Sequence, residues 1–165
     1  MLPHFQSTLA LPAGRGQEEV QVLIGNLLKG QTMVSAEVRQ TVLEVAREMV
    51  KHNIGAVPVL RDGQLAGIFS ERDLMSRVVV AGKHPAQTLV SEVMTDDPLT
   101  IDPNDSLETC MTLMRRHGFR HLPVCQGREL KGVISLRDVL LHDLDEKDDE
   151  VRMMRAYLHS SPDMG

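Results

Sequence analysis

Two short segments of this chain carry the same three chemically capable residues at the same spacing. Ser70, Arg72 and Asp73 follow one apolar run, and Ser135–Asp138, with the sequence Ser-Leu-Arg-Asp, follows another. An ionised carboxylate can accept hydrogen bonds from two adjacent hydroxyls, such as those of ribose. The free backbone N–H groups at a helix start, beside an arginine, can bind a phosphate. Each segment therefore has the groups to hold a ribose and a phosphate.

The same residues also fit a purely structural role, because a serine three positions before an acidic residue is a common helix cap. A cap requires only one member of Ser, Thr, Asp or Asn, whereas here serine, arginine and aspartate recur together after each Pro-Val strand pattern. We therefore treat both segments as candidate ligand sites. Gly67 and Gly132 would let each strand approach a ligand closely, although a glycine in a strand also marks a bulge.

These segments belong to a longer internal repeat. A constant shift of 65 positions lays residues 34–75 over residues 99–140 without a gap. Chance would supply about two or three identities over this length. The residues of the first copy that meet an identical residue in the second are Met49, His52, Pro58, Val59, Leu65, Gly67, Ser70, Arg72 and Asp73. The chain therefore contains two copies of one structural unit.

Each copy has the pattern of helix, strand, strand and helix. Apolar residues at i, i+3, i+4 and i+7 predict amphipathic helices that begin at Val42 and at Leu107. We expect Thr41 and Asp105 to be their N-caps, since each precedes a glutamate by three residues. The β-rich runs that follow are residues 56–60, 65–69, 121–125 and 130–134. A further helix is expected to begin after each Ser-x-Arg-Asp serine.

This pattern predicts an α+β fold in which the two helix-strand-strand-helix repeats pack around a pseudo-twofold axis. One copy alone is too small to bury both faces of its sheet. The segments that we expect are a flexible arm over 1–17, the first repeat with a leading helix over 18–81, a connector over 82–89, the second repeat over 90–142, and an acidic linker with a C-terminal helix over 143–165.

The composition limits the class of partner. Hydrophobic residues make up 42% and charged residues 25% of the chain, which is typical of a folded protein. The net charge of -5 and the aromatic content of 2% are unlike those of nucleic-acid-binding proteins. The sequence has no apolar run of the roughly 20 residues that span a membrane, and its start lacks the pattern of a signal peptide. We predict a cytoplasmic protein that binds neither nucleic acid nor membrane.

An enzyme is the first alternative class of protein. The sequence lacks the phosphate-loop, dinucleotide-binding, zinc-protease and serine-hydrolase motifs. His117 and His121 are expected on a helix end and a strand, so they should not share a metal. Cys110 and Cys125 lack the spacing of a disulfide framework or zinc site, and nothing marks Cys125 as a reactive thiolate for a redox switch. We predict a non-catalytic protein with no metal and no required cofactor.

The second copy resembles the signature of the CBS domain, the module named after cystathionine β-synthase. The resemblance rests on His-Leu-Pro-Val at 121–124 and Gly-Val-Ile-Ser-Leu-Arg-Asp at 132–138, and the first copy resembles the signature as well. It covers about residues 20–142. The resemblance implies a disc-like module of two repeats with two clefts, which often bind AMP, ATP, NAD or S-adenosylmethionine. It also implies that modules pair as homodimers.

The resemblance assigns roles to particular residues of this chain. Ser70 and Asp73 would hold ribose in one cleft, and Ser135 and Asp138 would hold it in the other. The candidates for phosphate contact are Arg72, Arg120 and Arg137. The residues that would border adenine are Ile54, Ala56, Val57, Phe119, His121 and Leu122. Thr100 falls near the start of the second repeat, where the family often contributes another contact.

The two copies differ where Gly55-Ala56 aligns with Arg120-His121. Arginine and histidine suit phosphate better than glycine and alanine, so we expect the second cleft, with Asp138, to bind more tightly. The hypothesis is a regulatory module that binds an adenosine-containing ligand between its repeats and signals to an unknown target protein. The alternative is a protein–protein interaction module whose nucleotide clefts are vestigial.

Overall fold

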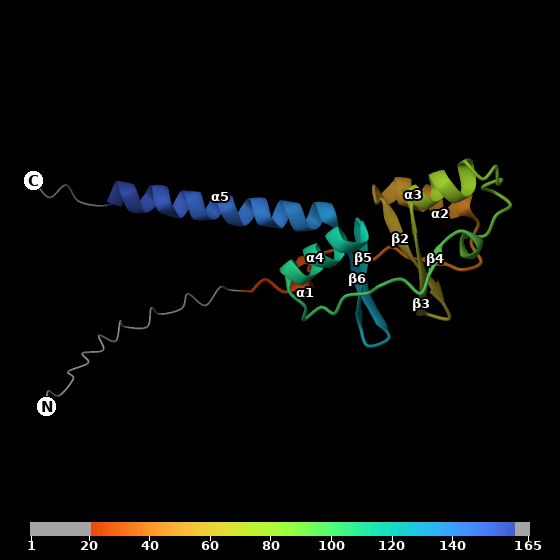
Figure 1. Cartoon of the computed structure of the whole chain (residues 1–165), viewed down its shortest axis with the longest axis horizontal. Coiled ribbons are helices and arrows are strands. Elements are labelled where there is room, and N and C mark those ends of the chain that lie inside the picture. The colour runs from red at the N-terminus through yellow and green to blue at the C-terminus, as the bar shows by residue number, and fades with distance from the viewer. Residues whose placement is uncertain (1–20, 161–165) are drawn as a thin grey trace, which may run out of the picture.

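The computed structural model describes residues 21–160, and the side chains among them up to residue 156, so the predicted arm over 1–17 lies outside the described residues. Helices and strands are both present (Figure 1). In chain order they are α1 Ile24–Leu27, β1 Ala36–Glu37, α2 Val42–His52, β2 Ala56–Arg61, β3 Gln64–Ser70, α3 Glu71–Asp73, a π-helix Leu74–Val79, a 3-10 helix Val90–Glu92, β4 Thr95–Asp96, α4 Leu107–His117, β5 His121–Gln126, β6 Glu129–Ser135 and α5 Leu136–Ser160.

The two hairpins confirm the internal repeat and the α+β class. β2 pairs with β3, β5 pairs with β6, and both pairs are antiparallel. A bulge follows Val59 in the first hairpin and Val124 in the second, at the same place in the repeat. The first hairpin is extended into a sheet of order β1-β2-β3-β4. β3 contacts β6, so the two repeats meet through their second strands.

The helix caps agree with the prediction in one copy only. Thr41 caps α2 through a reciprocal capping box with Glu44. The N-cap of α4 is Ser106 and not Asp105, because the Ser106 hydroxyl accepts the Thr109 N–H at 3.1 Å. The Asp105 carboxylate instead accepts the backbone N–H of Asp102 at 3.0 Å and closes the preceding turn.

The segment at the start of each repeat packs in the core of the other repeat, a contact that the predicted division at residues 18–81 and 90–142 did not include. The predicted leading helix is a single turn, and Ile24 in it is buried in the core of the second repeat. Its N–H donates to the Asp105 carbonyl at 2.9 Å. Val90 is buried in the core of the first repeat, and its N–H donates to the Gln40 carbonyl at 2.8 Å. The two repeats thus exchange their leading segments.

Two cysteines complete the packing of the second repeat. Cys110 and Cys125 are both buried free thiols, as predicted. Burial raises the pKa of the Cys110 thiol to about 11 and also raises the pKa of the Cys125 thiol. Both thiols are therefore protonated near neutral pH, which is the unreactive form.

The C-terminal region is one continuous helix, which corrects our prediction of an acidic linker that begins at residue 143. α5 runs without a break from Leu136 to Ser160 and projects from the body of the molecule (Figure 1). The acidic run tolerates a helix because it contains neither glycine nor proline and because Lys147 pairs with Asp143 at 2.9 Å, one turn away. Among the helices that the structure describes, none is both long and apolar enough to cross a membrane.

Candidate functional site

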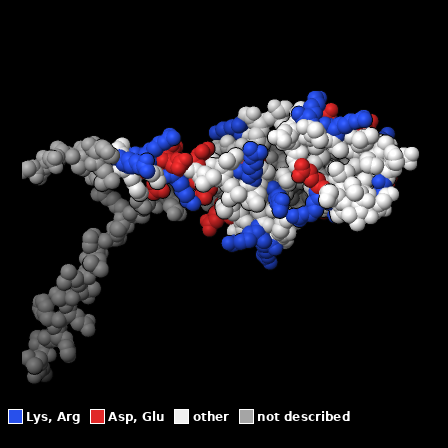
Figure 2. Space-filling model, turned by 90° about the horizontal axis from the view of Figure 1, so that it is seen from above, with Lys and Arg blue, Asp and Glu red and all other residues white. Residues whose placement is uncertain are grey.

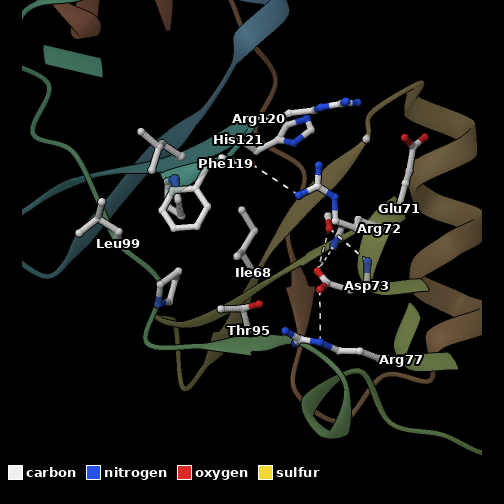
Figure 3. A pocket seen from close by; sticks show the side chains of 16 residues that line it. Ile68, Glu71, Arg72, Asp73, Arg77, Thr95, Leu99, Phe119, Arg120 and His121 are labelled. Carbon is white, nitrogen blue, oxygen red and sulfur yellow. Dashed lines mark hydrogen bonds and ion pairs between the residues drawn. The ribbon is translucent and has the colours of Figure 1, made fainter. Parts of the chain in front are cut away.

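A cleft of about 290 Å³ lies between the two repeats (Figure 3). The first repeat contributes the residues at the start of α3, and the second contributes residues 118–123 at the start of β5. This volume lies near the lower end of the range of about 300–1,000 Å³ that is usual for small-molecule sites. Of the predicted site residues, the cleft brings together Ser70, Arg72, Asp73, Phe119, Arg120, His121 and Leu122.

Ser70 and Asp73 form a reciprocal cap at one end of the cleft. The Asp73 carboxylate oxygen Oδ2 accepts the Ser70 N–H at 2.9 Å and the Ser70 hydroxyl at 2.8 Å. The Asp73 N–H donates in return to the Ser70 hydroxyl oxygen at 3.4 Å. The structural and functional interpretations of this motif are therefore compatible, because the cap fixes the carboxylate at the wall of the cleft. Asp73 is 9% exposed, so only one edge of it is open to a ligand.

Arg77 orients this carboxylate and was not among the predicted site residues. Its Nε lies 3.5 Å from Asp73 Oδ1, and its Nη1 donates to the carbonyls of Val93 and Met94 at 3.1 and 2.7 Å. Arg77 thus joins the helix start to the segment that leads into β4. The signal in the sequence is its position four residues after Asp73, which places the two side chains on one helical face.

The second repeat supplies an aromatic ring and two basic side chains to the same cleft. Phe119 stacks against His117, with ring centroids 5.3 Å apart and planes 8° from parallel. Arg72 of the first repeat donates from Nη1 to the Gly118 carbonyl at 3.5 Å, so it reaches across the cleft to the other repeat. Within residues 21–160, Arg120 forms no ion pair and is free to meet an anionic ligand.

His121 is half-buried between acidic and basic neighbours. A Cβ atom at Gly55 would lie 3.3 Å from both Glu71 Oε2 and His121 Nε2, so these two groups flank the glycine. Burial lowers the pKa of His121 below its usual 6.5, Glu71 and Asp138 act to raise the pKa, and Arg120 acts to lower it. The imidazole is therefore neutral near pH 7 in the free protein.

The cleft is apolar at one end and charged at the other. Figure 3 shows Ile68, Leu99 and Phe119 on one side, and Arg72, Asp73 and Glu71 on the opposite side. Residues 95, 98 and 99, at the beginning of the second repeat, were not predicted to line a site, because they precede its helix and its two strands in the chain. The predicted contact Thr100 is exposed and does not line the cleft.

A second, much smaller cleft occupies the pseudo-equivalent place. Its volume is about 90 Å³, and its lining includes Ile54 and Ala56 of the predicted set. The Leu28 side chain reaches into it, and a Cβ atom at Gly132 would lie 3.0 Å from a Leu28 methyl group. Val57 is buried in the core of the first repeat and does not line the cleft.

The expected assignment of basic residues to the second cleft is wrong. Arg120 and His121 line the cleft of Ser70 and Asp73, whereas Ser135, Arg137 and Asp138 line neither cleft among the described residues. The Ser135 and Asp138 side chains nevertheless repeat the same cap, with the hydroxyl donating to the carboxylate at 2.7 Å. The reason is the packing of the repeats, since the strand start of the second repeat faces the helix start of the first.

Within the described part of the chain, no group of three or more His, Cys, Asp or Glu side chains is placed to hold a metal ion.

The family model of the CBS domain matches residues 31–80 and 90–145, which together make up more than half of the chain. The protein therefore belongs to the CBS domain family, with two repeats of the domain in tandem.

Similar proteins occur in bacteria and plants. The chain is 37% identical over 108 residues to the CBS domain-containing protein YhcV of Bacillus subtilis, covering 66% of this chain and 76% of YhcV. It is 32% identical over 123 residues to the mitochondrial protein CBSX3 of Arabidopsis thaliana, covering 72% of this chain and 60%, less than two thirds, of CBSX3. The crystal structure of the CBS-domain containing protein ATU1752 from Agrobacterium tumefaciens superimposes with a TM-score of 0.69 and 34% identity, covering 74% of this chain and 99% of that one.

Proposed function

We propose that the chain is a non-catalytic regulatory module that binds one adenosine-containing ligand, such as AMP, ATP or NAD, in the cleft between its repeats. The observation that carries this proposal is the division of the cleft into an apolar end and a charged end. The adenine ring fits beside Ile68, Leu99 and Phe119, where it can stack on the exposed face of the aromatic ring. Asp73 then accepts the ribose hydroxyls.

The phosphate position in this proposal lies between Arg72, Arg120 and His121. Two guanidinium groups from different repeats can bind one phosphate with charge-assisted hydrogen bonds. The Glu71 carboxylate stands near His121 and limits the negative charge that the site can accept. This arrangement favours a ligand with a single phosphate at that position.

A ligand in this position would change the contact between the repeats. Arg72 spans the cleft through its bond to the Gly118 carbonyl, which at 3.5 Å is long and solvent-exposed. A phosphate that engages Arg72 and Arg120 would replace this weak bond by a bridge through the ligand. Regulation follows only if the target protein distinguishes the two arrangements, because a ligand shifts an equilibrium by its difference in affinity.

Thermal unfolding of nucleotide-stripped protein tests the proposed function. The panel contains AMP, ADP, ATP, NAD, S-adenosylmethionine and, as a control, GMP. A ligand at about a hundred times its Kd stabilises the folded state by about 2.7 kcal/mol, which is easily measured as a rise in Tm. We expect a rise with at least one adenosine ligand and a smaller one with GMP. An unchanged Tm across the panel would support the interaction-module alternative.

Binding of AMP is expected to tighten as the pH falls from about 8 to about 6.5. Burial holds the pKa of His121 below 6.5 in the free protein, so the imidazole is neutral there. An adjacent phosphate favours the imidazolium form and raises this pKa in the complex. The complex therefore binds a proton that the free protein does not, and lower pH favours it.

Isothermal calorimetry of AMP in buffers of different ionisation enthalpy measures this proton uptake. The variant His121→Asn removes the titrating group, and adenosine removes the phosphate. Both controls are expected to abolish most of the pH dependence. An equally steep dependence for adenosine and for AMP would show that the proton goes elsewhere.

A further inference from the structure

An open groove of about 540 Å³ continues from the cleft of Asp73 along α4. The groove and the cleft share Arg72, Gly118, Phe119 and Arg120, so they meet where the proposed function places the phosphate. Figure 2 shows Lys and Arg side chains over the body of the molecule, while many acidic side chains lie along the projecting helix. A group attached to the phosphate of a bound adenosine ligand would therefore extend into the groove, over a body that carries positive charge.

One face of α4 forms a wall of this groove. Glu108, Met111 and Arg115 all line the groove, at the i, i+3 and i+7 positions that share a helical face. Arg115 lies in the last turn of α4, shortly before Gly118, whereas Glu108 lies in the first turn. At about 1.5 Å per residue, these two residues are about 10 Å apart along the helix axis. With increasing distance from the phosphate position, the groove thus offers a cation, an apolar side chain and a carboxylate.

These three side chains are accessible, and their order is peculiar to the second repeat. Met111 is 38% exposed, and Glu108 and Arg115 are exposed as well. Within the described residues, neither Glu108 nor Arg115 forms an ion pair. In the first copy, the shift of 65 places at these positions the residues Leu43, Ala46 and Val50. The repeated fold therefore does not require the two charges on α4, which stand beside the larger cleft.

The order of these groups suits a second nucleoside better than a chain of further phosphates. Beyond Arg115, additional phosphates would pass over Met111, which offers no hydrogen-bond donor, and would approach the Glu108 carboxylate, which repels them. A nucleoside instead brings a flat base, which can pack against a methionine side chain. It also brings ribose hydroxyls, which can donate to a carboxylate. The cleft combines the same kinds of group, since Asp73 lies opposite apolar side chains there.

We propose that the groove is a subsite for the second half of a dinucleotide, in which a pyrophosphate joins a second nucleoside to adenosine. This inference rests on the proposed function, because it starts from an adenosine in the cleft. Arg72 and Arg120 bind the first phosphate, and Arg115 binds the second with charge-assisted hydrogen bonds. The second base packs against Met111, and Glu108 accepts the hydroxyls of the second ribose. The groove thereby selects dinucleotides over mononucleotides.

Calorimetry of the nucleotide-stripped, full-length chain with AMP, NAD and ATP tests this subsite. NAD contains AMP and a second nucleotide, so its additional contacts are expected to make it bind at least about tenfold more tightly than AMP. Arg115→Ala and Glu108→Ala are each expected to weaken NAD binding at least about fivefold and to change AMP binding less than about twofold. Arg116→Ala is the matched control, because Arg116 lies on the same helix but does not line the groove.

The outcomes separate the subsite from the proposed function. Tightest binding of NAD, with losses confined to NAD in the two groove variants, supports the subsite. Equal affinities for AMP and NAD, or an NAD affinity that both groove variants leave unchanged, would overturn the subsite while the proposed function stands. ATP that binds more tightly than NAD and depends more on Arg115 would also overturn it, because the groove would then hold phosphates. Failure of all three ligands to bind would count against the proposed function itself and remove the basis of the subsite.

Discussion

Asp73→Asn is expected to weaken AMP binding at least about tenfold, whereas Asp138→Asn is expected to change it by less than about twofold. Asparagine preserves the size of the side chain and one acceptor oxygen for the serine cap, but it removes the negative charge. Charge-assisted hydrogen bonds contribute about 1.5–3 kcal/mol, so the loss of ribose contacts gives this magnitude. The difference arises because Asp73 lines the open cleft and Asp138 lines neither cleft.

The repeat supplies a matched control for this experiment. Ser70 with Asp73 and Ser135 with Asp138 form the same reciprocal cap, with hydroxyl-to-carboxylate distances of 2.8 and 2.7 Å. Weakening of the cap should therefore cost the two variants a similar amount, and Asp73→Asn also removes the ion pair with Arg77, so its Tm is expected to fall further. Calorimetry below the lower Tm then isolates the ligand contact. Equal losses of affinity in the two variants would contradict the assignment of the ligand to the first cleft.

Gly67→Ala is expected to destabilise the fold by about 2–3 kcal/mol, far more than the equivalent change Gly132→Ala. A Cβ atom at Gly67 would lie 2.5 Å from the Met94 sulfur and 2.8 Å from the Thr95 carbonyl oxygen. That carbonyl is part of β4, which pairs with β3 and cannot move freely. At Gly132 the nearest atoms are the methyl groups of Leu28, the end of a flexible side chain.

Thermal and urea-induced unfolding of the two alanine variants measure this difference. A loss of 2–3 kcal/mol corresponds to a fall in Tm of about 4–12 °C for a chain of this size. We expect Gly132→Ala to lose less than about 1 kcal/mol. Gly67 and Gly132 leave room for Met94, Thr95 and Leu28 of the same chain. This corrects the role first considered for them, which was to let a strand approach a ligand. Equal stability of both variants would mean that β4 separates easily from β3.

The local structure followed from the sequence because local signals were strong. The gapless shift over residues 34–75 and 99–140 predicted the hairpins, their repeated order and the helices that follow Ser70 and Ser135. The α4 cap was displaced by one residue, since Asp105 and Ser106 both have capping side chains and local pattern does not choose between them. The acidic run of α5 was misjudged because charge alone does not break a helix.

The exchange of leading segments had no local signal. The Leu107 N–H donates to the Val22 carbonyl, and the Val42 N–H donates to the Thr88 carbonyl in the equivalent contact. The two donors are 65 positions apart in the chain, whereas the two acceptors are 66 positions apart. An alignment with a constant shift of 65 therefore does not match equivalent residues before Val34. The spacing of apolar residues also does not show which of the two cores a segment joins. Only the folded structure shows that Ile24 packs in the core of the second repeat and Val90 in the core of the first.

The residue types of the candidate site were predicted, but their grouping into clefts was not, for a related reason. The resemblance identified the right residue types in both repeats, yet which helix start faces which strand start depends on the packing of the repeats. Arg120 illustrates this, because its carbonyl accepts the Leu136 N–H of its own repeat while its side chain lines the cleft of the other. The small size of the second cleft, which Leu28 lines, depends equally on a segment that is distant in the chain.

The stoichiometry of AMP binding by isothermal calorimetry tests the central claim most directly. The larger cleft has about 290 Å³ and contains Asp73, whereas the other has about 90 Å³ and is narrowed by Leu28. The account predicts one AMP per chain for nucleotide-stripped protein, with binding weakened at least about tenfold in Asp73→Asn and little changed in Asp138→Asn. Two equivalent AMP molecules per chain, or one that persists in Asp73→Asn and disappears in Asp138→Asn, would contradict it.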